Sequence, residues 1–165
     1  METLPEENKK EFRYAGFWLR FVAYLIDYLI LQFAGFIVSL PFIGGIVLSA
    51  VGLENRTGND EMMFFGIAGI LGMVFLLVTI NLLLGWLYYA FMQSSKTQAT
   101  LGKMALNLLV TDLEGNRISF GKATARYFSK FISNMTLYIG YILAGLTEKK
   151  QALHDMIAGT LVIKK

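Results

Sequence analysis

Two long stretches with almost no charged side chains constrain this chain more than any other feature of its sequence. Over residues 21–53 the only Asp, Glu, Lys or Arg is Asp27, and over residues 62–92 there is none. About 20 consecutive apolar residues span the hydrocarbon core of a bilayer, and each stretch is longer than that. A soluble domain of 165 residues could not bury two such helices on all faces. The sequence therefore predicts an all-α membrane protein with transmembrane helices over residues 17–40 and 62–92.

The composition supports a membrane protein and excludes several kinds of site. Apolar residues make up 55% of the chain and charged residues 16%, whereas soluble domains average about 45–50% and about 25%. The chain has no cysteine, which excludes a disulfide, a catalytic thiolate and a cysteine-ligated metal. We expect no cofactor.

The first apolar stretch has room for one long or broken helix. Pro41 disfavours the helical conformation at the residue before it, so we expect the helix to kink or end at residue 40. A polar tail over residues 1–15, expected to be uncleaved, precedes this helix, and a polar outer loop over residues 54–61 follows the apolar run. Residues 16–165 are predicted to form one membrane domain.

Basic residues indicate which side of the membrane each segment occupies. Arg56 is the only Lys or Arg in the 54–61 loop. The segment that follows the second helix carries Lys96, Lys103, Arg117, Lys122, Arg126 and Lys130. Cytoplasmic loops carry the excess of Lys and Arg, so we expect the tail and residues 93–119 to be cytoplasmic. The chain is predicted to be a multi-pass protein of the cell membrane with a cytoplasmic N-terminus.

A small cytoplasmic sheet is predicted between the helical segments. Residues 108–111 form an apolar β-prone run, residues 112–116 are rich in turn formers, and residues 117–119 could return as a hairpin. The similar run at residues 160–163 could pair with residues 108–111. We therefore expect a β-hairpin or a small sheet on the cytoplasmic side.

A third helix, first amphipathic and then apolar, is predicted over residues 120–147. Lys122, Arg126 and Lys130 recur at intervals of four residues on one face. A cationic amphipathic helix beside a membrane lies in the interface. The partner of the stripe is therefore expected to be anionic lipid headgroups, and we expect no nucleic-acid partner.

The end of this helix leaves the position of the C-terminus open. Residues 131–147 are just long enough for a third span, which would put the C-terminus outside. The basic residues of segment 148–165 and the predicted sheet instead require the C-terminus on the cytoplasmic side. In that case residues 120–147 lie along the membrane or dip into it and return, and we favour this alternative.

Several motifs in a fixed order resemble the RDD family. They are Gly16–Arg20 with Ala23–Asp27, Thr100–Met104, Val110–Asp112 with Gly115, Arg126, and Gln151–Thr160. The family is named for one Arg and two Asp, which here are Arg20, Asp27 and Asp155. The resemblance implies a small bacterial membrane protein in which these three residues form an ionic cluster. Some members of the family have been linked to sodium/proton exchange.

Asp27 has two interpretations, because a carboxylate about 10 Å deeper along the helix than Arg20 is costly without a partner. The functional interpretation makes it a cation or proton site, supported by Gln32, Thr79 and Asn81. The structural interpretation makes it the partner of Arg20, Arg126 or Lys130. We favour the second, because a hairpin of two helices with one acid cannot line a pathway alone. Transport would require a homo-oligomer.

The pair His154-Asp155 invites a metal or catalytic interpretation. His154 is the only histidine, and no second set of ligands has metal spacing. We expect no metal site, and we expect Asp155 to cap the turn at residues 153–159 and to pair with a basic residue such as Arg20. Residues 100–103 resemble the end of a phosphate-binding loop but lack its earlier glycine and its strand. No enzymatic signature remains.

Two functions remain open from the sequence. The chain is expected to be a regulatory or scaffold subunit that docks on another membrane protein. The alternative is a small oligomeric transporter, with cation/proton exchange as the reaction. Sparse polarity within the spans favours the first function, and the family resemblance favours the second.

Overall fold

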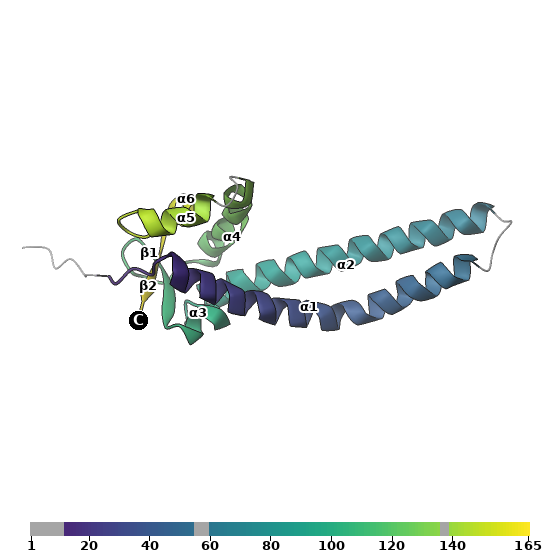
Figure 1. Ribbon diagram of the computed structural model, residues 1–165, viewed down its shortest axis with the longest axis horizontal. Coiled ribbons are helices and arrows are strands. Elements are labelled where there is room, and N and C mark those ends of the chain that lie inside the picture. The colour runs from purple at the N-terminus through teal and green to yellow at the C-terminus, as the bar shows by residue number, and fades with distance from the viewer. Residues whose placement is uncertain (1–11, 55–59, 136–138) are drawn as a thin grey trace, which may run out of the picture.

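A long helical stem and a small head make up the chain in the computed structural model, which describes residues 12–54, 60–135 and 139–165 (Figure 1). The stem consists of α1 (Phe17–Glu54) and α2 (Asp60–Ser94), which lie side by side. The head contains α3 (Leu101–Ala105), β1 (Leu108–Asp112), α4 (Phe120–Met135), α5 (Ile139–Leu146), α6 (Leu153–Ala158) and β2 (Thr160–Lys164). The head lies at the end of the stem where α1 begins and α2 ends.

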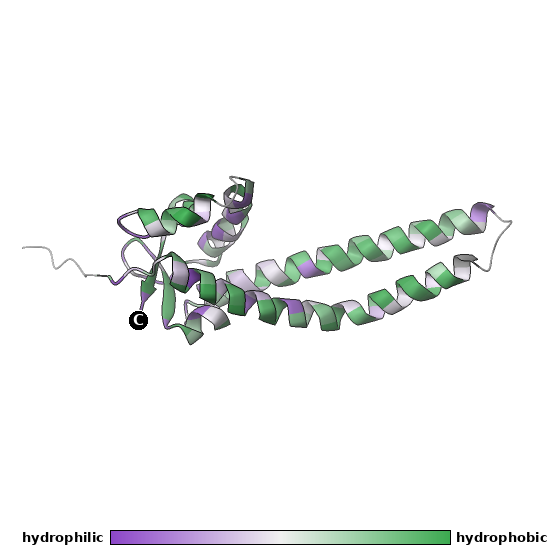
Figure 2. Ribbon diagram, viewed as in Figure 1, coloured by the Kyte–Doolittle hydropathy of each residue, from purple (hydrophilic) through white to green (hydrophobic). Residues whose placement is uncertain are grey.

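The stem helices are long and apolar enough to cross a membrane, over Phe17–Gly52 and Met63–Ser94. They have 38 and 35 residues, which at about 1.5 Å per residue gives lengths of about 57 and 52 Å against a hydrocarbon core of about 30 Å. Most residues of both stem helices are hydrophobic (Figure 2), and many of their large apolar side chains are exposed. Phe33, Leu48 and Phe75, for example, are 69%, 76% and 74% exposed. The prediction of an all-α membrane protein with two membrane helices is confirmed.

The predicted end of the first helix at residue 40 is wrong. α1 passes through Pro41 and ends at Glu54. A helix that ended within the hydrocarbon would leave backbone groups without partners, and membrane helices tolerate proline for this reason. The apolar residues after Pro41 therefore extend the same helix instead of forming an exit. α2 is likewise longer than the predicted 62–92 helix.

The predicted pairing of the two β-prone runs is confirmed. β1 and β2 are antiparallel, with Leu108 opposite Lys164 and Asp112 opposite Thr160. The predicted hairpin is reduced to an isolated bridge between Thr111 and Arg117. The Asp112 side chain accepts hydrogen bonds from the backbone N–H groups of residues 114 and 116, which closes a tight turn. Because β1 pairs with β2, residues 117–119 do not form a strand of the sheet.

The start of α1 and the end of the chain meet in the head. Tyr14 forms a bridge with Ile163, and the backbone N–H of Ala15 donates to the carbonyl of Val162 at 2.9 Å. β2 therefore lies between β1 and the residues that lead into α1. The chain thus ends on the side of the stem where α1 begins.

The continuous helix predicted over residues 120–147 is replaced by two shorter helices. α4 ends at Met135 and α5 begins at Ile139, and residues 136–138 lie outside the described part. In the described part of the chain, neither helix is among the two candidate spans. α4 packs against α2 and α6, and α5 packs against α1 and α6. Residues 139–146 therefore return to the head. This agrees with the alternative in which residues 120–147 do not cross the membrane and the C-terminus lies on the side where α1 begins.

The core lies where the head meets the stem. Small side chains from three helices allow close packing there, against larger apolar side chains of the sheet. The buried cluster consists of Ala15, Ala23, Ala90, Leu108, Val110, Ile118, Ala123 and Val162. The base of the stem is therefore held on the head by close contact of helix backbones.

Candidate functional site

Asp155 is the centre of a buried ionic network at the junction of stem and head. Its carboxylate is fully buried at the start of α6, and one oxygen accepts a hydrogen bond from the backbone N–H of Ala152 at 3.2 Å. Arg126 of α4 approaches the other oxygen, with its Nε at 2.8 Å and its Nη2 at 2.6 Å. Arg20 of α1 donates from Nη1 to Asp155 Oδ2. The expected pairing of Asp155 with Arg20 is confirmed.

The two arginines connect this network to both stem helices. Arg20 belongs to α1, and its Nε donates to the carbonyl of Ala15 at 2.8 Å. Arg126 donates from Nη1 to the side-chain oxygen of Gln93 in α2 at 2.9 Å. One carboxylate therefore holds four helices together: α1, α2, α4 and α6.

The ionised form of Asp155 is strongly favoured in the folded protein. Burial alone would raise the pKa of this carboxyl group, but the positive charges of Arg126 and Arg20 lower it well below its ordinary value. Asp155 is therefore a carboxylate throughout the physiological pH range. Removal of its charge would leave two buried guanidinium groups without a counterion.

Asp27 occupies a separate site, in which it forms no ion pair with any residue that the structure describes. Its carboxylate is 1% exposed and accepts hydrogen bonds from the Tyr88 hydroxyl at 2.7 Å and the Thr100 hydroxyl at 2.6 Å. The backbone N–H of Gly102 donates to it at 2.8 Å, and the N–H of Leu101 donates to the Tyr88 hydroxyl at 3.1 Å. Asp27 thus ties α1 to α2 and to the start of α3 through neutral donors.

Both sequence-based interpretations of Asp27 predicted the wrong neighbours. No basic side chain contacts it in the described residues, because Arg20 and Arg126 are engaged with Asp155. Of the expected polar helpers, Gln32 is exposed, while Thr79 and Asn81 donate to carbonyls of their own helix. The RDD residues therefore form one ion pair and one hydrogen-bonded carboxylate instead of a three-residue cluster.

Gly102 is required by the close approach of α3 to α1. A Cβ atom at this position would lie 2.1 Å from the carbonyl oxygen of Ala23 and 3.0 Å from the carboxylate of Asp27. The backbone of α1 cannot move aside without breaking the Asp27 hydrogen bonds. Glycine is therefore the residue that allows the α3 backbone to reach a carboxylate in α1.

We expect Gly102→Ala to lower the free energy of unfolding by about 1–3 kcal/mol, because the added methyl overpacks a backbone contact. Gly121→Ala is the matched control: its Cβ would meet nothing closer than the Ser119 hydroxyl at 3.9 Å. In helix α4 that change should be neutral or stabilising by up to about 1 kcal/mol. Thermal unfolding in detergent measures both, and equal stability of the two variants would contradict the tight contact.

The prediction that Lys122, Arg126 and Lys130 face lipid headgroups together is wrong. Arg126 is 3% exposed and bound to Asp155, and the Lys130 ammonium lies 3.8 Å from the centre of the Tyr89 ring. Of the three, Lys122 alone is exposed. The spacing correctly placed them on one face of α4, but that face points into the junction. The apolar face, with Phe128 and Phe131 half exposed, points outward.

Two lysines, Lys103 and Lys130, lie in this junction in surroundings that disfavour their charged form. Lys103 in α3 is buried and forms no ion pair in the described part of the chain. Burial, with the nearby charges of Arg126 and Lys130, lowers its pKa well below the ordinary value. Burial and Arg126 lower the pKa of Lys130 to about 7. The junction therefore tends to hold these lysines in the neutral form.

His154 supports Asp155 and is neutral at physiological pH. Its Nε2 lies 3.3 Å from Asp155 Oδ1, and its Nδ1 lies 3.4 Å from the Ser133 hydroxyl. Burial lowers the pKa of His154 to about 3. The described residues contain no group of three or more His, Cys, Asp or Glu side chains placed to hold a metal ion. His154 therefore acts as a neutral neighbour that fills the space beside Asp155.

Two residues that complete the sites, Tyr88 and Gln93, lie outside the motifs that carry the family resemblance, so no sequence signal pointed to them. The segment 100–103 resembles the end of a phosphate-binding loop, and one of its backbone N–H groups, that of Gly102, does donate to an anion, the carboxylate of Asp27. The sequence signal that could have placed Thr100 and Gly102 near Asp27 is that all three residues belong to the motifs of the family resemblance.

A known protein family and several of its relatives are similar in sequence to most of the chain. The RDD family matches residues 14–159, nearly the whole described chain. Two relatives from Bacillus subtilis (strain 168) are "Uncharacterized protein YxaI", 35% identical over 92% of this chain and 97% of the relative, and "Uncharacterized membrane protein YteJ", 28% identical over 91% of this chain and 80% of the relative. No solved structure matches the chain. The extent of the family match and the identity to its relatives show that the chain belongs to the RDD family.

Proposed function

We propose that the chain is an accessory subunit of the cell membrane, which regulates or anchors another membrane protein through lateral contact with its stem. The observation that carries the proposal is the way polar groups are distributed. Arg20 and Asp27, the charged groups of the candidate spans, are used to fix the head on the stem. The exposed surface of the candidate spans is then uncharged and suited to contact with other helices.

Gln32 is the polar group that favours such a contact. It lies about 22 Å along α1 from Phe17, close to the middle of the candidate span, and its side chain is exposed. It forms no hydrogen bond with any described residue. A carboxamide in hydrocarbon is stabilised when it finds a partner on a neighbouring helix. We therefore place the docking surface of the stem on the face of α1 that carries Gln32.

The distribution of basic residues supports a cytoplasmic head. The residues that enter or belong to the head include Arg13, Lys96, Lys122, Lys149 and Lys164, whereas α2 begins at the far end of the stem with Asp60 and Glu61. An excess of Lys and Arg is characteristic of the cytoplasmic side. In this orientation the head is available to cytoplasmic parts of the partner while the stem lies along its membrane helices.

We expect Gln32→Leu to weaken association with the partner about three- to tenfold, which corresponds to the loss of one interhelical hydrogen bond of roughly 0.6–1.5 kcal/mol. A photo-crosslinking side chain placed at Phe36, one turn further along α1, would report the contact in native membranes. The measured quantity is the yield of a crosslinked product of one fixed mass, with and without the Gln32 change.

Thr79→Val is the matched control, because the Thr79 hydroxyl already donates to the Phe75 carbonyl of its own helix at 2.8 Å. It removes a mid-span polar group without removing a contact to a partner and should leave the yield unchanged. Crosslinks to copies of the same chain alone, or a yield that Gln32→Leu does not alter, would contradict the accessory role.

The exposed carboxamide also supports a second candidate function, a small oligomeric cation or proton transporter. In that arrangement Gln32 side chains of several copies would face a shared path. The surroundings of Asp27 weigh against it, because both carboxylate oxygens accept hydrogen bonds from protein donors. A cation would have to displace these donors before it reached the carboxylate.

A further inference from the structure

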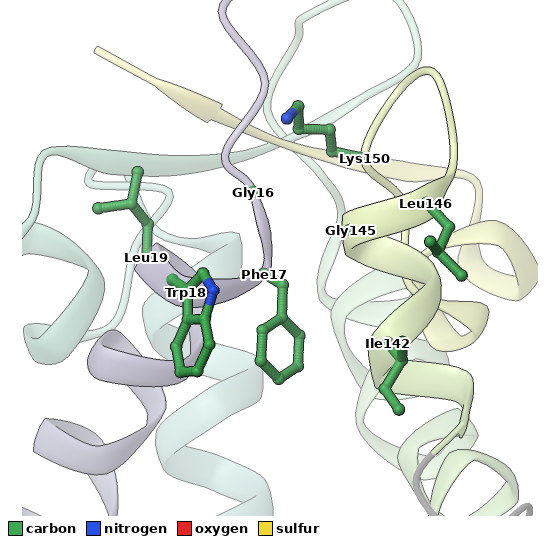
Figure 3. A pocket seen from close by; sticks show the side chains of 8 residues that line it. All are labelled: Gly16, Phe17, Trp18, Leu19, Ile142, Gly145, Leu146 and Lys150. Atoms are coloured by element: carbon green, nitrogen blue, oxygen red, sulfur yellow. The ribbon is translucent and has the colours of Figure 1, made fainter.

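An open groove lies between the start of α1 and the end of α5, beside the base of the stem. Its volume is about 410 Å³. Phe17 and Trp18 form one wall and Ile142 and Leu146 the other, and Lys150 lies at one end (Figure 3). The groove is therefore apolar along its length and cationic at one end.

Two glycines keep the groove open. At Gly145 a Cβ atom would meet Phe17 at 3.7 Å, and at Gly16 it would meet the side chain of Lys150, including its ammonium nitrogen, at 3.7 Å. Larger side chains at either position would occupy the space. The Lys150 ammonium thus lies over the backbone that leads into the first membrane helix.

Lys150 is held in place by a defined turn. Its backbone is in the left-handed region with φ of 48°, a conformation unfavourable for a residue with a side chain. Its N–H donates to the carbonyl of Thr147 at 2.9 Å, and the Thr147 hydroxyl accepts from the N–H of Gln151 at 2.7 Å. The turn therefore fixes the position of the Lys150 Cα atom, from which the side chain extends.

The surroundings of the groove match an amphiphilic anion of the bilayer. Trp18 is 74% exposed at the beginning of a candidate membrane span, where tryptophan lies at headgroup level. Leu146, at the end of α5 on the other wall, is 76% exposed. Lys149 and Arg13 are exposed close in sequence to Lys150 and Gly16. Positive charge next to apolar surface at this depth attracts anionic lipid.

We propose that this groove binds one anionic glycerophospholipid, with an acyl chain between the two apolar walls and the phosphate at Lys150. The site is independent of the stem surface that carries Gln32. It would fix the head against the membrane surface whichever protein the stem contacts.

The two tryptophans of the chain, Trp18 in the groove and Trp86 outside it, provide a direct test. The full-length Trp86→Phe protein would be reconstituted in vesicles that contain phosphatidylglycerol and phosphatidylcholine, one of which carries brominated chains. Bromine quenches a tryptophan that it contacts. The attraction of one basic residue for anionic lipid predicts an enrichment of brominated phosphatidylglycerol at Trp18 of about fivefold over phosphatidylcholine.

Lys150→Gln should reduce this enrichment to nearly one, and Gly145→Phe should lower quenching of Trp18 by both lipids because it fills the groove. Lys165→Gln, which removes an equal charge outside the groove, should leave the enrichment unchanged. Trp86 in a Trp18→Phe protein should show no preference. Equal quenching of Trp18 by the two lipids, or a preference that survives Lys150→Gln in protein with unchanged thermal unfolding, would overturn the proposal.

Discussion

Replacement of Asp155 with Asn should lower the free energy of unfolding by about 3–5 kcal/mol, because it breaks a buried ion pair and leaves charged partners behind. Arg20 and Arg126 both depend on this carboxylate, and the Arg126 side chain is 3% exposed. The Arg126 guanidinium is buried and the Arg20 side chain is only 12% exposed, so water can compensate little for the lost charge. Denaturant unfolding in detergent micelles measures the loss.

Glu148→Gln is the control for this change, because Glu148 is exposed and forms no ion pair in the described residues. It should alter stability by less than about 0.5 kcal/mol. A double variant, Arg126→Met with Asp155→Leu, should be less destabilised than Asp155→Asn, since apolar replacement of a buried pair leaves fewer charges unpaired. An Asp155→Asn protein as stable as the unaltered one would show that Gln93 and the backbone suffice to hold the arginines.

The same carboxylate should make the folded protein sensitive to acid. The pKa of Asp155 is lower in the folded protein than in the unfolded chain, where it is near 3.9. The unfolded state therefore binds more protons as the pH falls below about 4, and the stability that Asp155 contributes is fully present above that pH and lost below it. The decrease in the free energy of unfolding between neutral pH and a pH below about 4 should be smaller for Asp155→Asn than for the unaltered protein.

The features that could be predicted from the sequence depend on local pattern. Residues 21–53 contain one charged residue, Asp27, and residues 62–92 contain none. This pattern is sufficient to predict two membrane helices, because an apolar chain that crosses the hydrocarbon must form its backbone hydrogen bonds internally. The β-prone runs at residues 108–111 and 160–163 were matched correctly, since few other segments of the chain could pair with either. The ion pair of Arg20 with Asp155 could be predicted because the family motifs contain few charged residues that could pair with each other.

The orientation of side chains relative to the rest of the fold could not be predicted in this way. A repeat of four residues places Lys122, Arg126 and Lys130 on one face of α4 but does not say whether that face meets lipid or protein. In water a polar face normally points outward, whereas at a membrane the apolar face can point outward and the polar face inward. The partners of Asp27 come from two separate segments, α2 and residues 100–102, and only the packing of α3 on α1 brings Gly102 to it.

Asp27→Ala should lower the free energy of unfolding by about 4 kcal/mol, because two hydroxyl groups and one backbone N–H would lose their acceptor in a buried site at about 1–3 kcal/mol each. The donors are those of Tyr88, Thr100 and Gly102. Asp27→Asn should have a much smaller effect, about 1 kcal/mol. Its amide oxygen can accept from Tyr88 and Gly102, and the Thr100 hydroxyl can turn to accept from its amide nitrogen.

This contrast between alanine and asparagine separates a structural role of Asp27 from a transport role. A carboxylate that binds cations or protons needs its charge, so in a transporter Asp27→Asn would abolish a cation flux into liposomes while the protein remained folded. If Asp27 fixes α3 on the stem, Asp27→Asn should be nearly as stable as the unaltered protein, and no flux should depend on this residue. Asp60→Asn, which removes an exposed carboxylate at the far end of the stem, is the control for charge alone. A flux that is present in the unaltered protein, retained by Asp60→Asn and lost in folded Asp27→Asn would contradict the accessory role and support the oligomeric transporter.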